Sequence, residues 1–170
     1  MKAIKIILGI ITALVIIFFA TGLIVKETAY TSEVEINKPI DEVFAFFVNP
    51  ETLKKWLPEV KSFDPIEEKE GRIGSTYKMI VDNQGQDMVM IEKILAYVEN
   101  EKMTFQFDSD QMLKVDDFNF TSNGSATKMI QHSTVKSKSY MMACLFPYFK
   151  GMFEKQSQEY MNSFKKLAEN

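Results

Sequence analysis

The strongest constraint in this sequence is an uncharged apolar run near its beginning. The run extends from Ile6 to Val25, and only two glycines and two threonines interrupt it. A helix of about twenty residues, rising roughly 1.5 Å per residue, crosses the hydrocarbon core of a bilayer. The run has no polar face, which disfavours an amphipathic helix of a soluble domain. We therefore expect residues 1–27 to form a membrane anchor and residues 28–170 to form one separate domain.

The residues around this run indicate its orientation. Lys2 and Lys5 precede it, so the positive-inside rule places the N-terminus in the cytoplasm and the following domain outside it. The alternative is a signal peptide, because Ala20-Thr21-Gly22 resembles a cleavage site after which residues 1–22 would be lost. The run exceeds the roughly 7–15 apolar residues of a signal peptide and continues past this site, which favours an uncleaved, single-pass anchor.

The composition excludes several kinds of site. The chain has 20 basic and 23 acidic residues, and this net charge of −3 gives no electrostatic basis for a nucleic-acid partner. With one cysteine and one histidine, the chain has no disulfide framework and no zinc site built from several such residues. We expect no metal and no cofactor, and we assign no catalytic residue. Cys144 is expected to be a buried, inert thiol, and His132 to face away from the interior.

The residues after the anchor predict an α+β domain. A strand over 31–36 is followed by two short helices, the first opened by Pro39 and the second ending before Pro58. Five or six strands follow, in which apolar and polar residues alternate. Within one of them, the pair Asp116-Asp117 lies between two apolar pairs and predicts a β-bulge. We expect these acids to serve in turns and in the protection of sheet edges.

An amphipathic helical pattern from about Ser139 to Leu167 closes the chain. Pro147 marks either a kink in this helix or its true start. Strands joined by short turns pair antiparallel, and a sheet with one apolar face needs a cover. Because this helix is the only cover long enough, we expect a helix-grip fold, in which a curved antiparallel sheet surrounds a long C-terminal helix.

The segment 33–58 resembles the START/Bet v 1-like (SRPBCC) superfamily, and most of all its polyketide cyclase/dehydrase and lipid-transport branch. The positions that carry the likeness are Pro39, Val43, Phe44, Asn49, Pro50, Leu53, Trp56 and Pro58. The stretches GRIGSTY at 71–77 and SATKM at 125–129 are similar to the superfamily as well, but less specifically. The resemblance covers about residues 30–167, and many bacterial members carry a similar N-terminal membrane helix.

This resemblance, together with the apolar strand faces, predicts a ligand cavity between the sheet and the C-terminal helix. Methionine and aromatic side chains suit an irregular apolar ligand. Gln131 stands where many relatives have a tryptophan, which predicts a more polar wall at that point. The predicted cavity residues are Trp56, Tyr77, Met79, Met103, Phe105, Phe107, Phe118, Phe120, Met129, Gln131, Phe149 and Phe153. The alternative is a filled core, in which these side chains only pack.

Three functions fit these patterns. The leading hypothesis is a membrane-tethered domain that binds a small hydrophobic molecule, such as a lipid, quinone, isoprenoid or polyketide-like compound. The second is a cyclase- or dehydratase-like enzyme, with Tyr77, Gln131 and Ser133 as inward-facing polar candidates. The third is a protein-interaction module of the cell envelope that binds no ligand. The observation that separates them best is whether a void lies between the C-terminal helix and the sheet.

Overall fold

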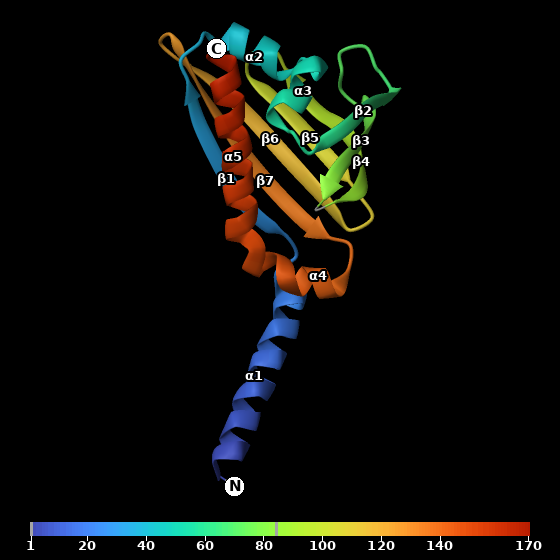
Figure 1. The fold of residues 1–170 in the computed structure, drawn as a ribbon, viewed down its shortest axis with the longest axis vertical. Helices are drawn as coiled ribbons and strands as arrows, with labels where there is room; N and C mark the ends of the chain where they lie inside the picture. The colour runs from blue at the N-terminus through green and yellow to red at the C-terminus, as the bar shows by residue number, and fades with distance from the viewer. Residues whose placement is uncertain (1, 84) are drawn as a thin grey trace.

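The N-terminal apolar run forms one helix that projects from the lower end of the rest of the fold (Figure 1). The computed structural model describes residues 2–83 and 85–170. Helix α1 (Lys2–Ile24) is the one helix among these residues that is long and apolar enough to cross a membrane. Nearly all of its side chains are exposed, as expected of a helix that meets lipid rather than a protein core.

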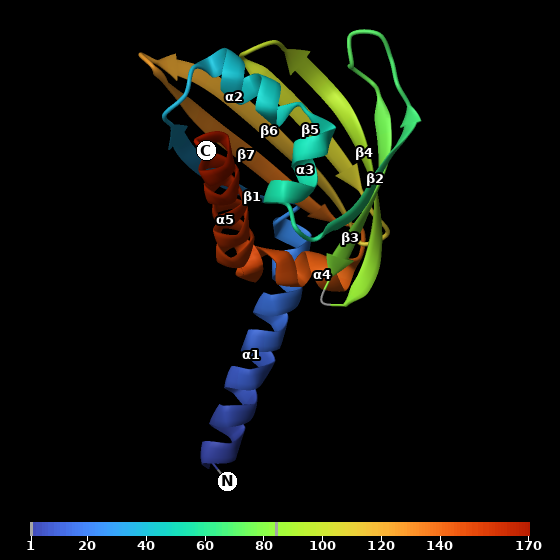
Figure 2. The ribbon, with the colours of Figure 1, turned by 45° about the horizontal axis from the view of Figure 1, so that its top comes forward.

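Seven antiparallel strands form one curved sheet in the order β1-β7-β6-β5-β4-β3-β2 (Figure 2). The strands are β1 (Thr28–Ile36), β2 (Val60–Glu67), β3 (Thr76–Asn83), β4 (Gln86–Val98), β5 (Lys102–Asp108), β6 (Met112–Asn123) and β7 (Ala126–Ser137). Strands β2 to β7 follow one another as a meander, and β1 pairs with β7 along its whole length. The sheet is therefore antiparallel throughout, as predicted.

Two short helices follow β1 and cross one end of the concave face of the sheet (Figure 2). Helix α2 (Ile40–Phe47) begins after Pro39, whose fixed φ suits the start of a helix. Helix α3 (Pro50–Trp56) is capped by Asn49, whose side-chain oxygen accepts a hydrogen bond of 3.0 Å from the amide of Glu51.

The C-terminal helical pattern is divided at Pro147. Helix α4 (Tyr140–Leu145) is capped by Ser139 and leads into the 3₁₀-helix η1 (Phe146–Phe149), which contains the proline. Helix α5 (Lys150–Ala168) then continues for 19 residues along the concave face beside β1 (Figure 1). Pro147 therefore marks the break before the long helix, and the predicted helix-grip fold is confirmed.

The register of β6 contradicts the predicted bulge. Strand β6 pairs with β7 residue by residue from Met112 to Asn123, without interruption at Asp116-Asp117. As side chains alternate between the two faces of a strand, Asp116 faces the concave side together with Lys114, and Asp117 faces the opposite side. The expectation that Asp116 serves in a turn or at an edge is therefore wrong. This residue is 4% exposed on the inner face of the sheet.

The packed core lies where α2 meets α5 and the sheet. Phe47 of α2 is central to it, with its ring centroid 5.5 Å from that of Phe164 of α5 and 5.2 Å from that of Phe120 of β6. Such aromatic contacts add to the free energy gained by burying apolar area. This core fixes one end of α5 on the sheet.

The lone histidine and the lone cysteine lie as expected. His132 is exposed on the convex face, where its Nδ1 lies 3.1 Å from the hydroxyl of Thr31. Cys144 is fully buried where α4 meets α1. Neither residue contributes to the cavity described below.

Candidate functional site

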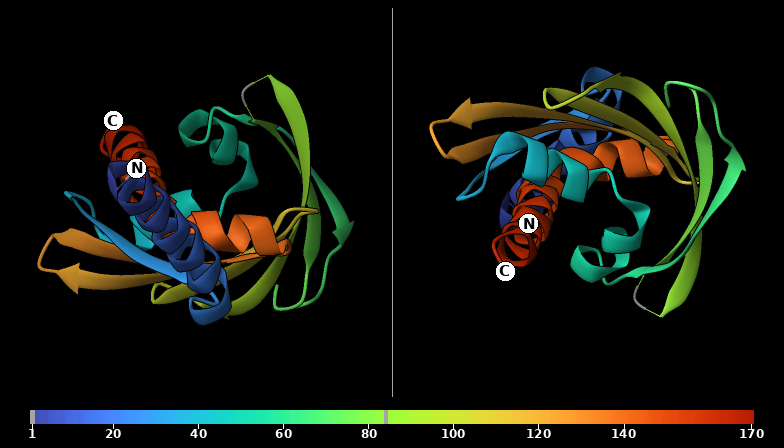
Figure 3. Two further views of the ribbon diagram at one scale, coloured as in Figure 1. Left: turned by 90° about the horizontal axis from the view of Figure 1, so that it is seen from below. Right: turned by 90° about the horizontal axis from the view of Figure 1, so that it is seen from above.

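A cavity of about 720 Å³ lies between the concave face of the sheet and the helices α3 and α5. Seen along the long axis of the molecule, the sheet curves round this region while the helices stand apart from its far strands (Figure 3). The volume falls within the roughly 300–1,000 Å³ of pockets that bind small molecules. The hollow between helix and sheet is therefore present, and the interior is not one solid core.

Most of the predicted cavity residues come together around this space. The residues of that set in its wall are Trp56, Tyr77, Met79, Met103, Phe105, Phe107, Phe118, Gln131, Phe149 and Phe153. Strands β3, β4 and β5 supply the methionine- and phenylalanine-rich side, and η1 and α5 supply the opposite side. The strand positions were predictable because their inward-facing side chains recur at every second residue.

Phe120 and Met129 do not lie in this wall. Phe120 is 3% exposed beneath α2, with its ring centroid 5.2 Å from those of Phe44 and Phe47. Met129 is fully buried in the same packed cluster. Both side chains point to the predicted face of the sheet, but helix α2 covers that part of the face and fills the space above them. They therefore serve in packing and leave the set of cavity residues.

Of the charged residues in the cavity wall, three lie on the concave face of the sheet and were not among the predicted residues. Glu92 of β4 and the pair Lys114 and Asp116 of β6 all point to the concave face. The Nζ atom of Lys114 lies 2.8 Å from the Oδ2 atom of Asp116. The signal for them was present, because Glu92 stands in phase with Met90 and Ile94 on its strand. In β6, the predicted bulge interrupted the alternation of side chains that places Lys114 and Asp116 on the concave face.

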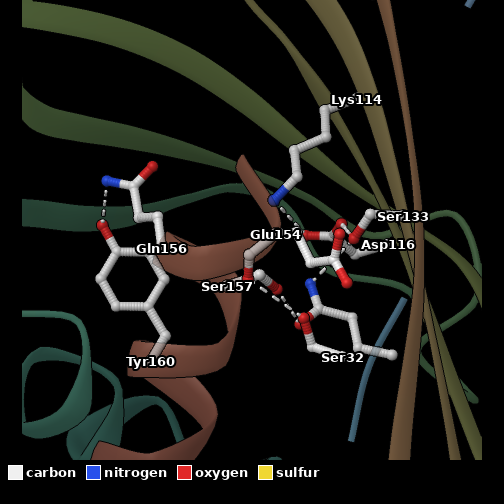
Figure 4. A network of polar contacts seen from close by, with 9 residues as sticks. Ser32, Lys114, Asp116, Ser133, Glu154, Gln156, Ser157 and Tyr160 are labelled. Atoms are coloured by element: carbon white, nitrogen blue, oxygen red, sulfur yellow. Dashed lines mark hydrogen bonds and ion pairs between the residues drawn. The ribbon is translucent and has the colours of Figure 1, made fainter. Parts of the chain in front are cut away.

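A chain of hydrogen bonds connects this ion pair to α5 (Figure 4). The hydroxyl of Ser133 donates to Asp116 at 2.6 Å, and the amide nitrogen of Gln131 donates to Ser133 at 3.1 Å. The hydroxyl of Ser157, on α5, donates to the amide oxygen of Gln131 at 2.6 Å. The polar position predicted at Gln131 is thus a structural bridge between β7 and α5. A connected buried network of this kind holds its side chains in one arrangement.

The burial of these groups changes their protonation. Desolvation raises the pKa of Glu92 to about 8, and the nearby negative charge of Asp116 adds to this effect. Desolvation opposes the ammonium of Lys114, but Asp116 and Tyr30 outweigh it, so the pKa of Lys114 lies above its usual value. At neutral pH this end of the cavity holds an ion pair and a neutral carboxylic acid, and Glu92 is then able to donate a hydrogen bond.

A second polar group lies between α3 and α5. The indole N–H of Trp56 and one carboxylate oxygen of Glu59 are buried without a hydrogen-bond partner among the described residues, and both side chains line the cavity. The phenol of Tyr160 lies beside Glu59. Burial raises the pKa of Tyr160 to about 12, and the charge of Glu59 acts in the same direction. A buried donor without a partner loses free energy that a ligand's acceptor atom would restore.

The polar candidates for catalysis are engaged in the fold. Ser133 and Gln131 take part in the network that supports Asp116, and the hydroxyl of Tyr77 donates to Glu68 at 3.3 Å. Among the groups that line the cavity, the carboxyl of Glu92 has the pKa that is shifted most from its usual value. Within residues 2–83 and 85–170, no three His, Cys, Asp or Glu side chains converge in the manner of a metal site.

Known proteins share the sequence pattern and the fold of this chain. The family model described as activator of Hsp90 ATPase homolog 1-like protein matches residues 37–169. None of the curated proteins matches the chain in sequence. Many solved structures share its fold.

Three of these structures illustrate the likeness. An aromatase/cyclase, ZhuI of Streptomyces sp. R1128, has a TM-score of 0.71 and 11% identity, over 84% of this chain and 94% of its own. A START superfamily protein of Mycobacterium smegmatis has a TM-score of 0.70 and 17% identity, over 83% and 97%. TTHA0849 of Thermus thermophilus has a TM-score of 0.69 and 15% identity, over 82% and 96%. At such identities the likeness shows the fold, and the predicted START-like (SRPBCC) resemblance is confirmed.

Proposed function

The chain belongs to the family of activator of Hsp90 ATPase homolog 1-like proteins, and from its open cavity we propose that it binds a small, mainly apolar molecule. The observation that carries this proposal is the cavity of about 720 Å³ whose walls are rich in methionine and phenylalanine. Flexible methionine and broad aromatic side chains accommodate irregular apolar ligands. A domain that needed only stability would gain by filling this space.

The polar end of the cavity narrows the class of ligand. The protonated Glu92 and the ammonium of Lys114 both offer hydrogen-bond donors, whereas Asp116 is already occupied by Lys114 and Ser133. A ligand that fits this arrangement has an acceptor oxygen at one end, such as a carbonyl, quinone or ester. The N–H of Trp56, a side chain that also lines the cavity, has no partner among the described residues and is a further candidate donor. Among lipids, quinones, isoprenoids and polyketide-like molecules, the oxygen-bearing ones fit best.

Helix α1 adds a location to this binding function. Its length and apolar character fit a single membrane crossing, and the lysines at its start favour an N-terminus in the cytoplasm and a domain outside it. A tethered domain meets lipophilic molecules at the surface in which they are concentrated. We therefore propose a membrane-tethered binding domain for a lipophilic ligand.

The single tryptophan of the chain gives a direct test. Trp56 lines the cavity, so a brominated fatty acid that enters should quench its fluorescence. The full chain in lipid nanodiscs would be titrated with 9,10-dibromostearic acid, and we expect quenching that saturates. Absence of saturable quenching, together with the absence of any small molecule that copurifies with the chain, would refute the proposal.

Matched variants control for binding elsewhere. Met79 and Met90 pair across β3 and β4 inside the cavity, while their neighbours Lys78 and Val89 lie exposed on the convex face. The double variant Met79→Phe/Met90→Phe narrows the cavity and should weaken the titration several-fold. Lys78→Phe/Val89→Phe adds the same rings outside and should leave it unchanged. Equal effects of the two pairs would show that the fatty acid binds outside the cavity.

Glu92 favours a second candidate function, acid–base catalysis on a bound ligand. A carboxylic acid with a pKa near 8 inside a cavity is suited to donate a proton at neutral pH. The chain would be incubated with the molecule that copurifies with it, followed by mass spectrometry. A binding protein returns the molecule unchanged, whereas an enzyme converts it and loses this conversion in Glu92→Gln.

A further inference from the structure

Helix α4 lies at the lower end of the domain, beside α1 (Figure 1), and an exposed apolar surface extends over it and the segment that follows. Its side chains are between 38% and 59% exposed and come from α4, η1 and the first turn of α5. We name this set the apolar rim, and its members are Tyr140, Met141, Tyr148, Phe149 and Met152. Exposed apolar side chains gathered in this way mark an interaction surface.

Specific contacts hold the rim against α1. The hydroxyl of Tyr140 donates a hydrogen bond of 2.6 Å to the backbone carbonyl of Phe19, and the hydroxyl of Tyr148 lies 3.1 Å from that of Thr21. A Cβ atom at Gly22 would lie only 2.5 Å from the Sγ atom of Cys144, so glycine allows α4 to approach α1 closely. The position of the rim is therefore fixed relative to the anchor.

The position along α1 at which α4 makes contact determines how deep the rim lies in a bilayer that α1 spans. The apolar run ends at Val25, and at 1.5 Å per residue Phe19 and Gly22 lie about 9 Å and about 5 Å before that end. Interfacial helices bury their apolar faces to a depth of roughly 5–10 Å. When α1 spans a bilayer, α4 thus lies at the boundary between headgroups and acyl chains. Tyrosine, which the rim presents twice, is enriched at this boundary.

The charged residues around the rim also favour contact with a lipid surface. Residues 139–149 include no charged side chain, whereas Lys136 and Lys138 precede them and Lys150 follows. Lys138 also pairs with Asp108. The chain as a whole has a net charge of −3, whereas the charged residues nearest to this segment in sequence are all lysines. An apolar segment flanked by lysines is suited to an anionic lipid surface.

The rim is continuous with the cavity. Phe149 and Met152 are exposed members of the rim and also line the cavity wall. We propose that the apolar rim inserts into the surface of an anionic bilayer and forms the opening through which the ligand passes between bilayer and cavity. The insertion depends only on α1 spanning the membrane, while the passage of ligand rests on the binding function proposed above.

Insertion is tested with a tryptophan placed in the rim. In the full chain carrying Trp56→Phe, Met141→Trp adds a fluorophore on the rim outside the cavity wall, and Ile66→Trp adds one to the comparably exposed β2. In nanodiscs of phosphatidylglycerol brominated on its acyl chains, the rim variant should be quenched roughly twofold or more, and the β2 variant little. Equal quenching of the two variants, or a rim tryptophan open to aqueous acrylamide, would overturn the insertion and leave this surface to a protein partner.

Passage of the ligand is tested by a rate. Dibromostearate would be loaded into separate vesicles and its arrival followed by the quenching of Trp56 in the tethered chain. Met141→Asp places a charge in the rim and should slow this transfer several-fold without changing its final extent, while Ile66→Asp should leave both unchanged. An unchanged rate in Met141→Asp would overturn the proposed opening. Failure of Trp56 to respond in any variant, with Met141→Trp quenched by lipid, would instead refute the binding function alone.

Discussion

The two ends of the space beneath α5 are built on one continuous sheet and differ in what covers them. At one end, Phe120 and Met129 of β6 and β7 pack in one cluster with Phe44, Phe47 and Phe164. We call this end the packed half. At the other end, the inward-facing residues of β3 to β6 surround the cavity, which we call the hollow half. Figure 2 shows the cause, because α2 crosses only one end of the concave face, whereas the cavity lies beyond it, between the sheet and the helices α3 and α5.

Polar groups are distributed in accordance with this difference. In the packed half, the fully buried Thr127 has its hydroxyl satisfied by the backbone carbonyl of Lys38 at 2.8 Å. The hollow half contains Glu92, Lys114 and Asp116. A charged group without solvent or partner costs several kcal/mol, so such groups persist where a cavity gives access to water or ligand. Strand alternation therefore selects the inward side chains, and helix placement decides whether they pack or bind.

The largest expected difference between the halves is in the cost of removing a phenyl ring. Phe120→Ala in the packed half should lower the free energy of unfolding by about 3–5 kcal/mol, because the deleted ring leaves a cavity among the surrounding rings. Phe107→Ala in the wall of the hollow half should cost less, since its ring already borders an empty space. Thermal unfolding of the full chain in detergent micelles would compare them. Equal losses would show that the two halves are packed alike.

The inward-facing strand residues were predictable because their pattern has one physical cause. In β5, apolar residues occupy one face and polar residues the other, and β3 follows the same pattern except at Ile80, so the alternation fixes which side meets the core. The proline-started helices were predictable for a similar local reason. The antiparallel pairing of consecutive strands was predictable because short turns join them. The pairing of β1 with β7 was not predicted, since these strands are distant in sequence.

Strand β6 shows where this reasoning ends. It carries apolar pairs on both faces, with Leu113 and Val115 on the convex side and Phe118 and Phe120 on the concave side. The sequence therefore does not fix the phase of this strand, which is set by its pairing with β5 and β7. Whether an inward side chain is covered, as Phe120 is, depends on helices distant in sequence. Alternation along the strand carries no information about that cover.

The second prediction concerns the ion pair of the hollow half. Lys114→Met removes the cation beside Asp116 and leaves a buried carboxylate with only Ser133 as a partner. We expect the free energy of unfolding to fall by about 3 kcal/mol, because an uncompensated charge is costly in the interior. Lys102→Met provides the control, as Lys102 pairs with Asp117 on the convex face. A loss no greater than that of the control would show that water in the cavity screens Asp116 fully.

The third prediction follows from the raised pKa of Glu92. In the folded chain this carboxyl stays protonated up to about pH 8, whereas in the unfolded chain it ionises near its usual value of 4.5. Unfolding then releases a proton between these two values, so the stability contributed by the neutral acid falls as the pH rises through this window, by about 1.4 kcal/mol per pH unit. Glu92→Gln should remove this fall. Thermal unfolding of the unchanged chain and of Glu92→Gln, measured between about pH 5 and about pH 7.5, would test this. If the stability of the two proteins depends on pH in the same way, Glu92 is not neutral in the folded chain.

The smallest expected effect is at the boundary between the halves, where Trp56 belongs to both. Its ring packs against Phe47 and Phe164, with centroids at 5.9 and 5.4 Å, while its side chain also lines the cavity and its buried N–H has no hydrogen-bond partner among the described residues. Trp56→Phe keeps much of the packing and removes the donor. We expect the copurifying molecule to be held about threefold to tenfold more weakly, as measured by native mass spectrometry, which corresponds to one hydrogen bond of about 0.5–1.5 kcal/mol. Trp56→Leu should also lower the melting temperature clearly. If Trp56→Phe reduces stability as much as Trp56→Leu and leaves ligand retention unchanged, Trp56 belongs to the packed half alone.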